Sequence, residues 1–117
     1  MSRALGHLAE QRVAAWLEQK GVRLIDHNWN AKVGEIDLIG LYQQTLLFIE
    51  VRQRRSKRYG GAGASISLQK QTRLQRTAQL YLQLHPQYQH RRCRFDVVLL
   101  HGDVETGHCE WIQNAFP

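Results

Sequence analysis

The stretch that decides the fold is GEIDLIGLYQQTLLFIEVRQRR, residues 34–55, in which two apolar runs flank a short polar break at Gln43-Gln44. Residues 34–42 and 45–54 are rich in Ile, Leu, Phe and Val, as strands are, and the break between them suits a hairpin turn. Both runs nevertheless contain carboxylates. Because charges inside a strand are costly unless something nearby uses them, the stretch predicts a hairpin with a chemical role on one face.

The carboxylates of the first run are expected on the same face of the hairpin. Side chains alternate along a strand, so Glu35 and Asp37 should project to one side, with Ile36 and Leu38 on the other. The same rule separates Glu50 from the apolar residues directly before and after it in the second run.

A symmetric turn centred on Gln43-Gln44 would pair residues whose numbers sum to 87. Asp37 would then lie opposite Glu50, and Glu35 opposite Arg52. Opposed residues have Cβ atoms about 4.5–5.5 Å apart, and two carboxylates about 5 Å apart repel by roughly 3–4 kcal/mol at an effective dielectric constant near 20. A divalent cation, a shared proton or nearby Arg and Lys must offset this repulsion, and Mg²⁺ favours such oxygen ligands.

Two alternatives remain open for this hairpin. Gln-Gln lacks the Asn-Gly signature of a tight turn, and a three-residue loop would shift the register. The polar groups could also form an ordinary surface lattice of salt bridges around Glu35 and Arg52.

The rest of the chain predicts helices and strands around the hairpin. Helical spacing of apolar residues predicts a helix over residues 3–20. A second helix is predicted from a cap at Ser65 or Ser67 to about His85, with a buried stripe and a basic face. The stripe is Leu68, Leu74, Ala78, Tyr81 and Leu82, and the basic face is Lys70, Arg73 and Arg76. Further strands are predicted at 22–25, 94–100 and 110–113, with a loop from residue 26.

This element order predicts a mixed α/β (α+β) fold. Short links favour antiparallel pairing among the first three strands, and the long helical connection favours parallel addition of the fourth. We therefore expect a mixed sheet flanked by helices. The closing segment WIQNAFP could pack on the core of its own chain or on a second subunit, and packing on its own core is the expectation.

Length and composition predict one domain, residues 1–117, with a mobile basic loop at about 54–65. The chain is 43% hydrophobic and 22% charged, as folded soluble proteins are. No apolar leader or membrane-spanning run is visible, so the expected location is cytoplasmic, with no membrane partner.

The cysteines and histidines predict no metal site. Cys93 and Cys109 lie in or beside apolar segments and are expected to be small core residues. A zinc cluster of His101, His108 and Cys109 can be imagined, but the spacing favours scattered turn and surface residues.

The charge distribution points to a polyanion. Residues 51–95 contain eleven Lys or Arg and no Asp or Glu, whereas the rest contains five basic and ten acidic residues. Such asymmetry is typical of a nucleic-acid-binding face. A solvated helix face with a basic loop is the alternative.

Several motifs together resemble one known family. GEIDLIG, LLFIEVRQR, YGGA, a helix with Lys70 and Arg73-Leu74, RFDVV at 94–98 and WIQNAF resemble the YraN-type family over residues 10–116. That family is a bacterial branch of the PD-(D/E)XK nuclease-like superfamily, related to archaeal Holliday-junction resolvases. The resemblance implies a restriction-endonuclease-like αβββαβ core and, by analogy alone, a homodimer.

The resemblance also implies a metal site. Asp37 matches the metal-binding Asp of the superfamily, and Glu50 the acid of its Glu-x-Lys signature. The Val51 carbonyl would contact the same ion, Mg²⁺ or Mn²⁺, and Glu10 resembles a supporting helix carboxylate. Gly34 would allow close backbone approach where its strand begins.

One position departs from the family signature. Arg52 stands where the lysine that contacts the attacking water is usual. Arginine keeps the charge and binds phosphate bidentately, but it is a poor general base. Lys70, on the helix that faces the scissile phosphate in such nucleases, would be the substitute, giving Glu10, Asp37, Glu50, Arg52 and Lys70 as the catalytic set.

Three functions follow as hypotheses. The first is metal-dependent hydrolysis of a phosphodiester in DNA, with branched DNA as one candidate substrate; the second is a nucleic-acid-binding module without turnover, favoured by Arg52. The third is a protein-interaction domain for an acidic partner. The expected nucleic-acid contacts are Arg54, Arg55, Lys57, Arg58, Tyr59, Arg73 and Arg76.

Overall fold

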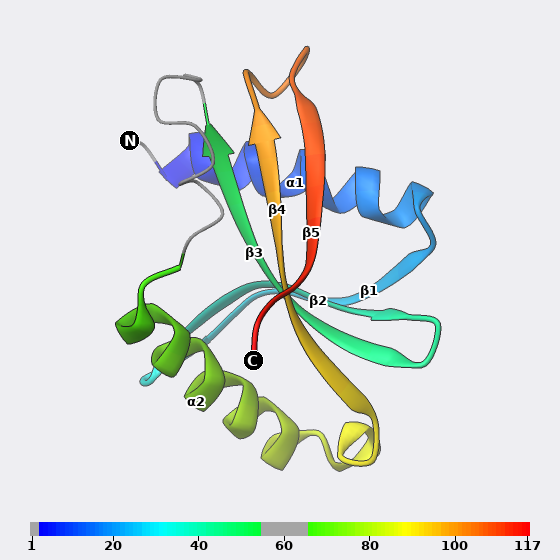
Figure 1. Ribbon diagram of the computed structural model, residues 1–117, viewed down its shortest axis with the longest axis vertical. Coiled ribbons are helices and arrows are strands. Elements are labelled where there is room, and N and C mark those ends of the chain that lie inside the picture. Colours follow the sequence, from blue (N-terminus) through cyan, green and yellow to red (C-terminus); the bar gives the residue numbers. More distant parts are fainter. Residues whose placement is uncertain (1–2, 55–65) are drawn as a thin grey trace.

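The computed structural model describes residues 3–54 and 66–117, with side chains from His7 onward. The elements follow one another along the chain as Figure 1 shows. They are α1 (Arg3–Gln19), β1 (Val22–Ala31), β2 (Gly34–Tyr42), β3 (Thr45–Arg54), α2 (Leu68–Leu84), the 3₁₀ turn η2 (Pro86–Tyr88), β4 (Arg92–His101) and β5 (His108–Phe116). This order confirms the predicted mixed α/β fold. Most of the predicted basic loop, with Arg55, Lys57, Arg58 and Tyr59, lies outside the described residues.

The five strands form one mixed sheet in the order β1-β2-β3-β4-β5. β1 with β2, β2 with β3 and β4 with β5 are antiparallel, whereas β3 and β4 are parallel. The parallel pair is connected through α2, as the long link predicted. Both expectations about strand direction are confirmed.

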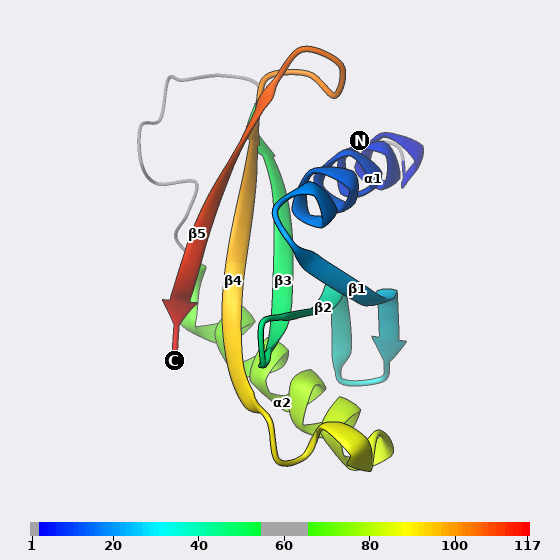
Figure 2. The same cartoon turned by 90° about the vertical axis from the view of Figure 1, so that its right-hand side faces the viewer.

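Each helix covers a different face of the sheet. α1 packs its apolar residues, including Val13 and Leu17, against Leu38, Leu47 and Ile49. α2 packs on a second cluster of buried residues: Ile36, Ile39, Leu46, Phe48, Leu74, Ala78, Tyr81, Val97 and Phe116 are among its members. In Figure 1, α1 crosses behind the upper half of β3, β4 and β5, whereas α2 lies at the lower left; Figure 2 shows α1 set off to one side of these strands.

Helix α2 begins at a side-chain cap, as the sequence predicted. The Ser67 hydroxyl accepts a hydrogen bond from the Lys70 N–H at 3.1 Å, and the helix ends before Pro86. Leu74, Ala78 and Tyr81 are buried, but Leu68 is 79% exposed. The prediction for Leu68 is therefore wrong, and the buried residues of α2 begin at Leu74.

The first strand is longer than predicted. It runs to Ala31, whereas a loop was expected from Asp26. Its polar residues misled the prediction because they have partners within the fold: Asp26, for example, accepts a hydrogen bond from the Tyr81 hydroxyl at 2.9 Å. Asn28 has a φ of 49°, a left-handed conformation in mid-strand. The strands predicted at 94–100 and 110–113 likewise extend to β4 and β5.

The alternation of β2 breaks at Asp37. Ile36 belongs to the core under α2, whereas Leu38 belongs to the core under α1, so the two do not share a face as predicted. Asp37 lies between them and across from the Asn28 region, since His27 pairs with Leu38 and Trp29 with Ile36. A local distortion of both strands therefore coincides with the predicted site.

The cysteine prediction is wrong for Cys93, which is exposed near the start of β4. Cys109 is half-buried and packs against the core under α1, with its Sγ 3.5 Å from a guanidinium nitrogen of Arg12. The prediction for the closing segment is confirmed: Phe116 is buried under α2 and stacks on Phe95. Within the described ranges, neither helix is long and apolar enough to cross a membrane.

Candidate functional site

The hairpin register confirms the predicted sum of 87 between β2 and β3. The pairs run from Tyr42–Thr45 to Leu38–Ile49. Beyond that point a side chain replaces the backbone pairing: Asp37 Oδ2 accepts a hydrogen bond from the Val51 N–H at 2.9 Å. The expected Glu35–Arg52 pair does not form, because the β2–β3 pairing ends at Leu38–Ile49; on its other edge, β2 pairs Glu35 with Asn30 of β1.

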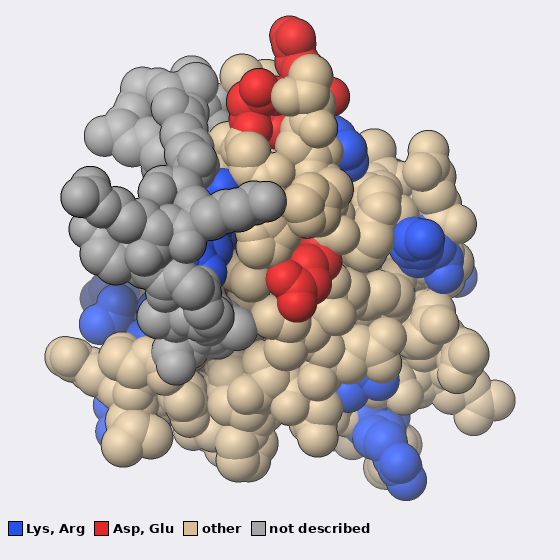
Figure 3. Space-filling view, turned by 45° about the horizontal axis from the view of Figure 1, so that its top comes forward, with Lys and Arg blue, Asp and Glu red and all other residues tan. Residues whose placement is uncertain are grey.

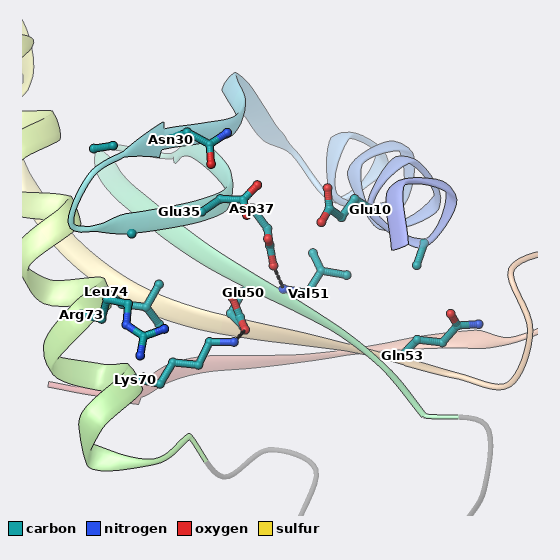
Figure 4. Close-up of a pocket in the computed structure, with 13 residues that line it drawn as sticks. Glu10, Asn30, Glu35, Asp37, Glu50, Val51, Gln53, Lys70, Arg73 and Leu74 are labelled. Carbon is teal, nitrogen blue, oxygen red and sulfur yellow. Dashed lines mark hydrogen bonds and ion pairs between the residues drawn. The ribbon is translucent and has the colours of Figure 1, made fainter. Parts of the chain in front are cut away.

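A pocket of about 570 Å³ opens where the pairing ends (Figure 4). Every layer of the fold contributes to it: α1 from one side, α2 from the other, and the first three strands between them. The lining residues are Ala9, Glu10, Asn30, Ala31, Gly34, Glu35, Asp37, Glu50, Val51, Gln53, Lys70, Arg73 and Leu74. The structure thus brings together Glu10, Asp37, Glu50, Val51, Lys70 and Arg73 from the predicted set.

Asp37 is strongly perturbed by this environment. Burial, the neighbouring Glu50 carboxylate and, more weakly, Glu10 raise the pKa of Asp37 to about 8, although the hydrogen bond from the Val51 N–H acts in the opposite direction. The carboxyl group therefore keeps its proton near neutral pH. A raised acid pKa beside like charges in a pocket is a frequent property of metal and catalytic sites.

Glu50 has a different partner. It is 7% exposed and forms an ion pair with Lys70 Nζ from the first turn of α2. Figure 4 shows Lys70 and Arg73 reaching from α2 on the Glu50 side, while Glu10 reaches from α1 toward Asp37 on the other. We call Lys70 and Arg73 the basic wall of the pocket, and Glu10, Glu35 and Asp37 its acidic wall.

Arg52 lies two residues beyond Glu50 on β3 and is half-buried. It is not among the residues that line the pocket, where the cations are Lys70 and Arg73. Its predicted role at the site therefore stays a prediction. Arg54 is the last residue of β3. Its carbonyl accepts a hydrogen bond at 2.8 Å from the N–H of Gly102, in the turn between β4 and β5.

Gly34 makes the close approach that was expected. A Cβ added there would lie 2.7 Å from Thr77 Oγ1 and 3.0 Å from Arg73 Cγ. The start of β2 therefore touches α2 directly, and this contact holds the basic wall beside the carboxylates. The close approach at Gly34 is thus to a helix of the same chain.

Sequence reasoning missed Asn28. Its Nδ2 donates to Glu10 Oε1 at 2.5 Å and, in a long contact of 3.4 Å, approaches Glu35 Oε1. It thereby links α1 to β2 at the edge of the acidic wall. The sequence offered little signal, because DHN in an otherwise polar stretch is typical of a loop.

The oxygen donors of this pocket are of the kind that divalent cations prefer. Asp37, Glu50 and the Val51 carbonyl would hold it, with Glu10 in support, since hard cations prefer oxygen ligands and complete their shell with water. The need for positive charge is visible in Asp37, which otherwise retains a proton. In the part of the chain with assigned side chains, no three His, Cys, Asp or Glu residues are already close enough together to enclose an ion.

A second hollow of about 380 Å³ lies beside the pocket and shares Arg73 with it. Its remaining lining is Val33 from the turn between β1 and β2, and Gln69, Thr72 and Arg76 from α2. These five lining residues include no carboxylate. The predicted basic face of α2 is therefore continuous with the pocket through Arg73.

A second group of acidic side chains lies away from the pocket. Figure 3 shows Asp and Glu side chains grouped at the upper end of one face, over the turn between β4 and β5, where Asp103 and Glu105 are exposed. Arg94, one of the cations counted in the basic segment, is bound bidentately to the buried Asp96 at 2.9 Å. Among the described residues, the cations that line the pocket and the second hollow are thus those of α2.

Comparisons with known proteins identify relatives across the chain. The model of "Uncharacterised protein family UPF0102" matches residues 9–100. A UPF0102 protein of Alcanivorax borkumensis is 47% identical over 112 residues, covering 95% of this chain and 90% of the relative. A UPF0102 protein of Nitrosomonas europaea is 49% identical over 111 residues, covering 95% and 92%.

Proposed function

This chain belongs to the uncharacterised protein family UPF0102, so we propose its function from the pocket itself. The proposal is that the protein binds nucleic acid, DNA in the first place, and hydrolyses a phosphodiester with Mg²⁺ or Mn²⁺. The membership agrees with the resemblance to the YraN-type family. The nuclease assignment rests on the chemistry of the site.

The observation that carries the proposal is the meeting of Asp37, Glu50 and Lys70. Two carboxylates from adjacent strands converge where the backbone pairing stops, and a lysine from another element reaches one of them. A fold that needed only stability would gain nothing from this arrangement, since the proximity of Glu50 and Glu10 helps force a proton onto Asp37. The arrangement suits a ligand that brings positive charge on one side and phosphate on the other.

Each residue of the pocket has a separate role in this proposal. Asp37 and Glu50 hold the cation, with Glu10 behind them, and a divalent cation there supplies positive charge to the phosphate and makes water more acidic. Lys70 and Arg73 place positive charge on the phosphate oxygens from the opposite wall. Lys70 is also the basic group nearest Glu50, so it takes the role that Arg52 fills poorly.

The nucleic-acid strand is proposed to leave the pocket along α2. Lys70, Arg73 and Arg76 follow one another at three-residue spacing on one face of this helix, and the second hollow continues the pocket on that side. Arg54 and the basic residues of the predicted loop would extend the same contact. Such binding releases counterions, so about six phosphate contacts would give a log–log salt slope of about −5.

The test is a cleavage assay on linear duplex, single-stranded and four-way-junction DNA, each with Mg²⁺ and with Mn²⁺. Wild type is compared with Asp37→Asn, Glu50→Gln and Lys70→Met. Glu18→Gln serves as the matched control, because Glu18 is an exposed carboxylate outside the pocket. Metal-dependent cutting that is lost in the three pocket variants and kept in the control is the expected result.

A nucleic-acid-binding module without turnover is the second candidate, and Arg52 favours it. Arg52→Lys separates the two: if wild type binds DNA but cuts nothing and Arg52→Lys gains cutting, the site is a nuclease scaffold disabled at one position. DNA binding that is unchanged by EDTA, with no cutting by either protein, would support the module. Absence of DNA binding at low salt would contradict both.

A further inference from the structure

Asn28 occupies a conformation that regular strands avoid. Its φ of 49° is left-handed, although it lies in the middle of β1 with paired residues on both sides. Among non-glycine residues, Asn tolerates this region best, because its short polar side chain can bond locally. The distortion coincides with the place where β2 changes faces around Asp37.

The consequence of this conformation is the direction of the Asn28 side chain. Its amide reaches Glu10 Oε1 at 2.5 Å, eighteen residues earlier in the chain, and lies 3.4 Å from Glu35 Oε1. Among the described side chains of α1, Ala9 and Glu10 line the pocket. No other hydrogen bond between a described side chain and the Glu10 carboxylate is found.

We propose that Asn28 is a positioning residue that holds the Glu10 carboxylate in the pocket. This inference rests on the proposed function, because it assigns Glu10 to the same cation site. Without the amide, the Glu10 side chain would lose its tether and turn toward solvent, since it faces two other carboxylates, Asp37 and Glu35, across the acidic wall. Partners that orient a ligand in this way typically change metal affinity by about 10–100-fold when removed.

Asn28→Gly is the informative substitution. Glycine adopts positive φ without strain, so the backbone distortion is kept and only the amide is lost. Asn114→Gly is the matched control: Asn114 has a φ of 53° in β5 and its side chain lies outside the pocket. If Asn28→Gly failed to fold, Asn28→Asp would serve, because Asp also tolerates this conformation and replaces the donor with an anion.

Two measurements test the inference. Mn²⁺ titration by calorimetry is expected to show about tenfold weaker binding for Asn28→Gly and for Glu10→Gln, no further loss in the double variant, and no change in Asn114→Gly. Carboxyl carbon NMR of the metal-free protein, with the Glu10 signal assigned through Glu10→Gln, is expected to show that signal moving toward the position of a solvated glutamate in Asn28→Gly.

The outcomes separate the inference from the proposed function. An unmoved Glu10 signal in Asn28→Gly overturns the positioning role, whatever the metal result. So does wild-type Mn²⁺ affinity in Asn28→Gly alongside weakened affinity in Glu10→Gln. If wild type bound no Mn²⁺, the proposed cation site would fail, and the NMR comparison alone would still decide whether Asn28 holds Glu10.

Discussion

Asp37 acts as a main-chain partner for Val51. Its Oδ2 accepts the Val51 N–H at 2.9 Å directly beyond the last β2–β3 pair, Leu38 with Ile49. The hydrogen bond fixes the carboxyl group beside Glu50 and, with it, the place where the sheet opens. One side chain therefore ends the hairpin pairing and forms the floor of the pocket.

Asp37→Asn is expected to stabilise the metal-free protein at pH 8. Asparagine still accepts the Val51 N–H but carries no charge. The pKa of Asp37 is raised from 3.8 to about 8, so between these pH values the folded chain binds a proton that the unfolded chain lacks, and stability is lost as pH rises. We expect a gain of about 1–3 kcal/mol in the free energy of unfolding at pH 8 and little near pH 4.

Urea denaturation at several pH values measures this gain. Glu18→Gln, which changes an exposed carboxylate on α1, should show no such trend. A pH-independent difference between Asp37→Asn and wild type would contradict the protonated Asp37.

Gly34→Ala is expected to destabilise the fold and weaken the basic wall. The new Cβ would lie 2.7 Å from Thr77 Oγ1 and 3.0 Å from Arg73 Cγ, so α2 must shift away from β2. Overpacking of this kind costs about 1–3 kcal/mol. Thermal unfolding would show the loss, and Gly34→Ala combined with Thr77→Ala should recover part of it. Additive losses in the double variant would show that the Thr77 contact is not the cause.

Asp96→Asn is expected to cost about 2–4 kcal/mol of stability, because Asp96 is a buried, fully used carboxylate. It is 1% exposed and accepts hydrogen bonds from Arg94, the Trp111 indole and the Asn114 N–H. An asparagine amide has one acceptor oxygen in place of two, so it cannot accept both hydrogen bonds from the Arg94 guanidinium in this way. Chemical denaturation followed by tryptophan fluorescence measures the loss, with Glu105→Gln as an exposed control. Wild-type stability of Asp96→Asn would refute the role of this network.

Arg73→Gln is expected to reduce the salt dependence of DNA binding. Loss of one phosphate contact should lower the log–log slope by about 1 and weaken binding regardless of sequence. Fluorescence anisotropy between about 50 and 200 mM salt gives the slope. Arg23→Gln, an exposed arginine of β1 outside both hollows, should leave the slope unchanged. Equal slopes for Arg73→Gln and wild type would remove Arg73 from the proposed path.

The hairpin and its carboxylates could be predicted because two physical rules agreed there. Apolar runs fixed the strands, and the polar break fixed a two-residue turn, so the register followed by arithmetic and Asp37 came to lie beside Glu50. The second helix could be predicted equally well, since Ser67 and Pro86 mark its ends. Lys70 could be placed on this helix, although its ion pair with Glu50 depends on how the helix docks.

The parts that sequence reasoning missed depend on contacts between distant segments. The polar half of β1 looked like a loop because the partners of Asp26 and Asn28, Tyr81 and Glu10, lie far away in the chain. The change of face between Ile36 and Leu38 breaks the period-two rule on which the prediction relied. A left-handed residue in mid-strand has no signature in a single sequence, because Asn is also common in turns.

The ion pair between Lys70 and Glu50 has a consequence for how the protein is made. Among the described residues that line the pocket, the four carboxylates lie within residues 10–50, whereas the cations lie at residues 70 and 73. During synthesis the carboxylates are therefore made first. At least twenty further residues must be added before Lys70, which pairs with Glu50, is present. Until α2 docks, the emerging hairpin carries mutually repelling charges without these two cations, so a half-made chain lacks part of the nucleic-acid site that we propose.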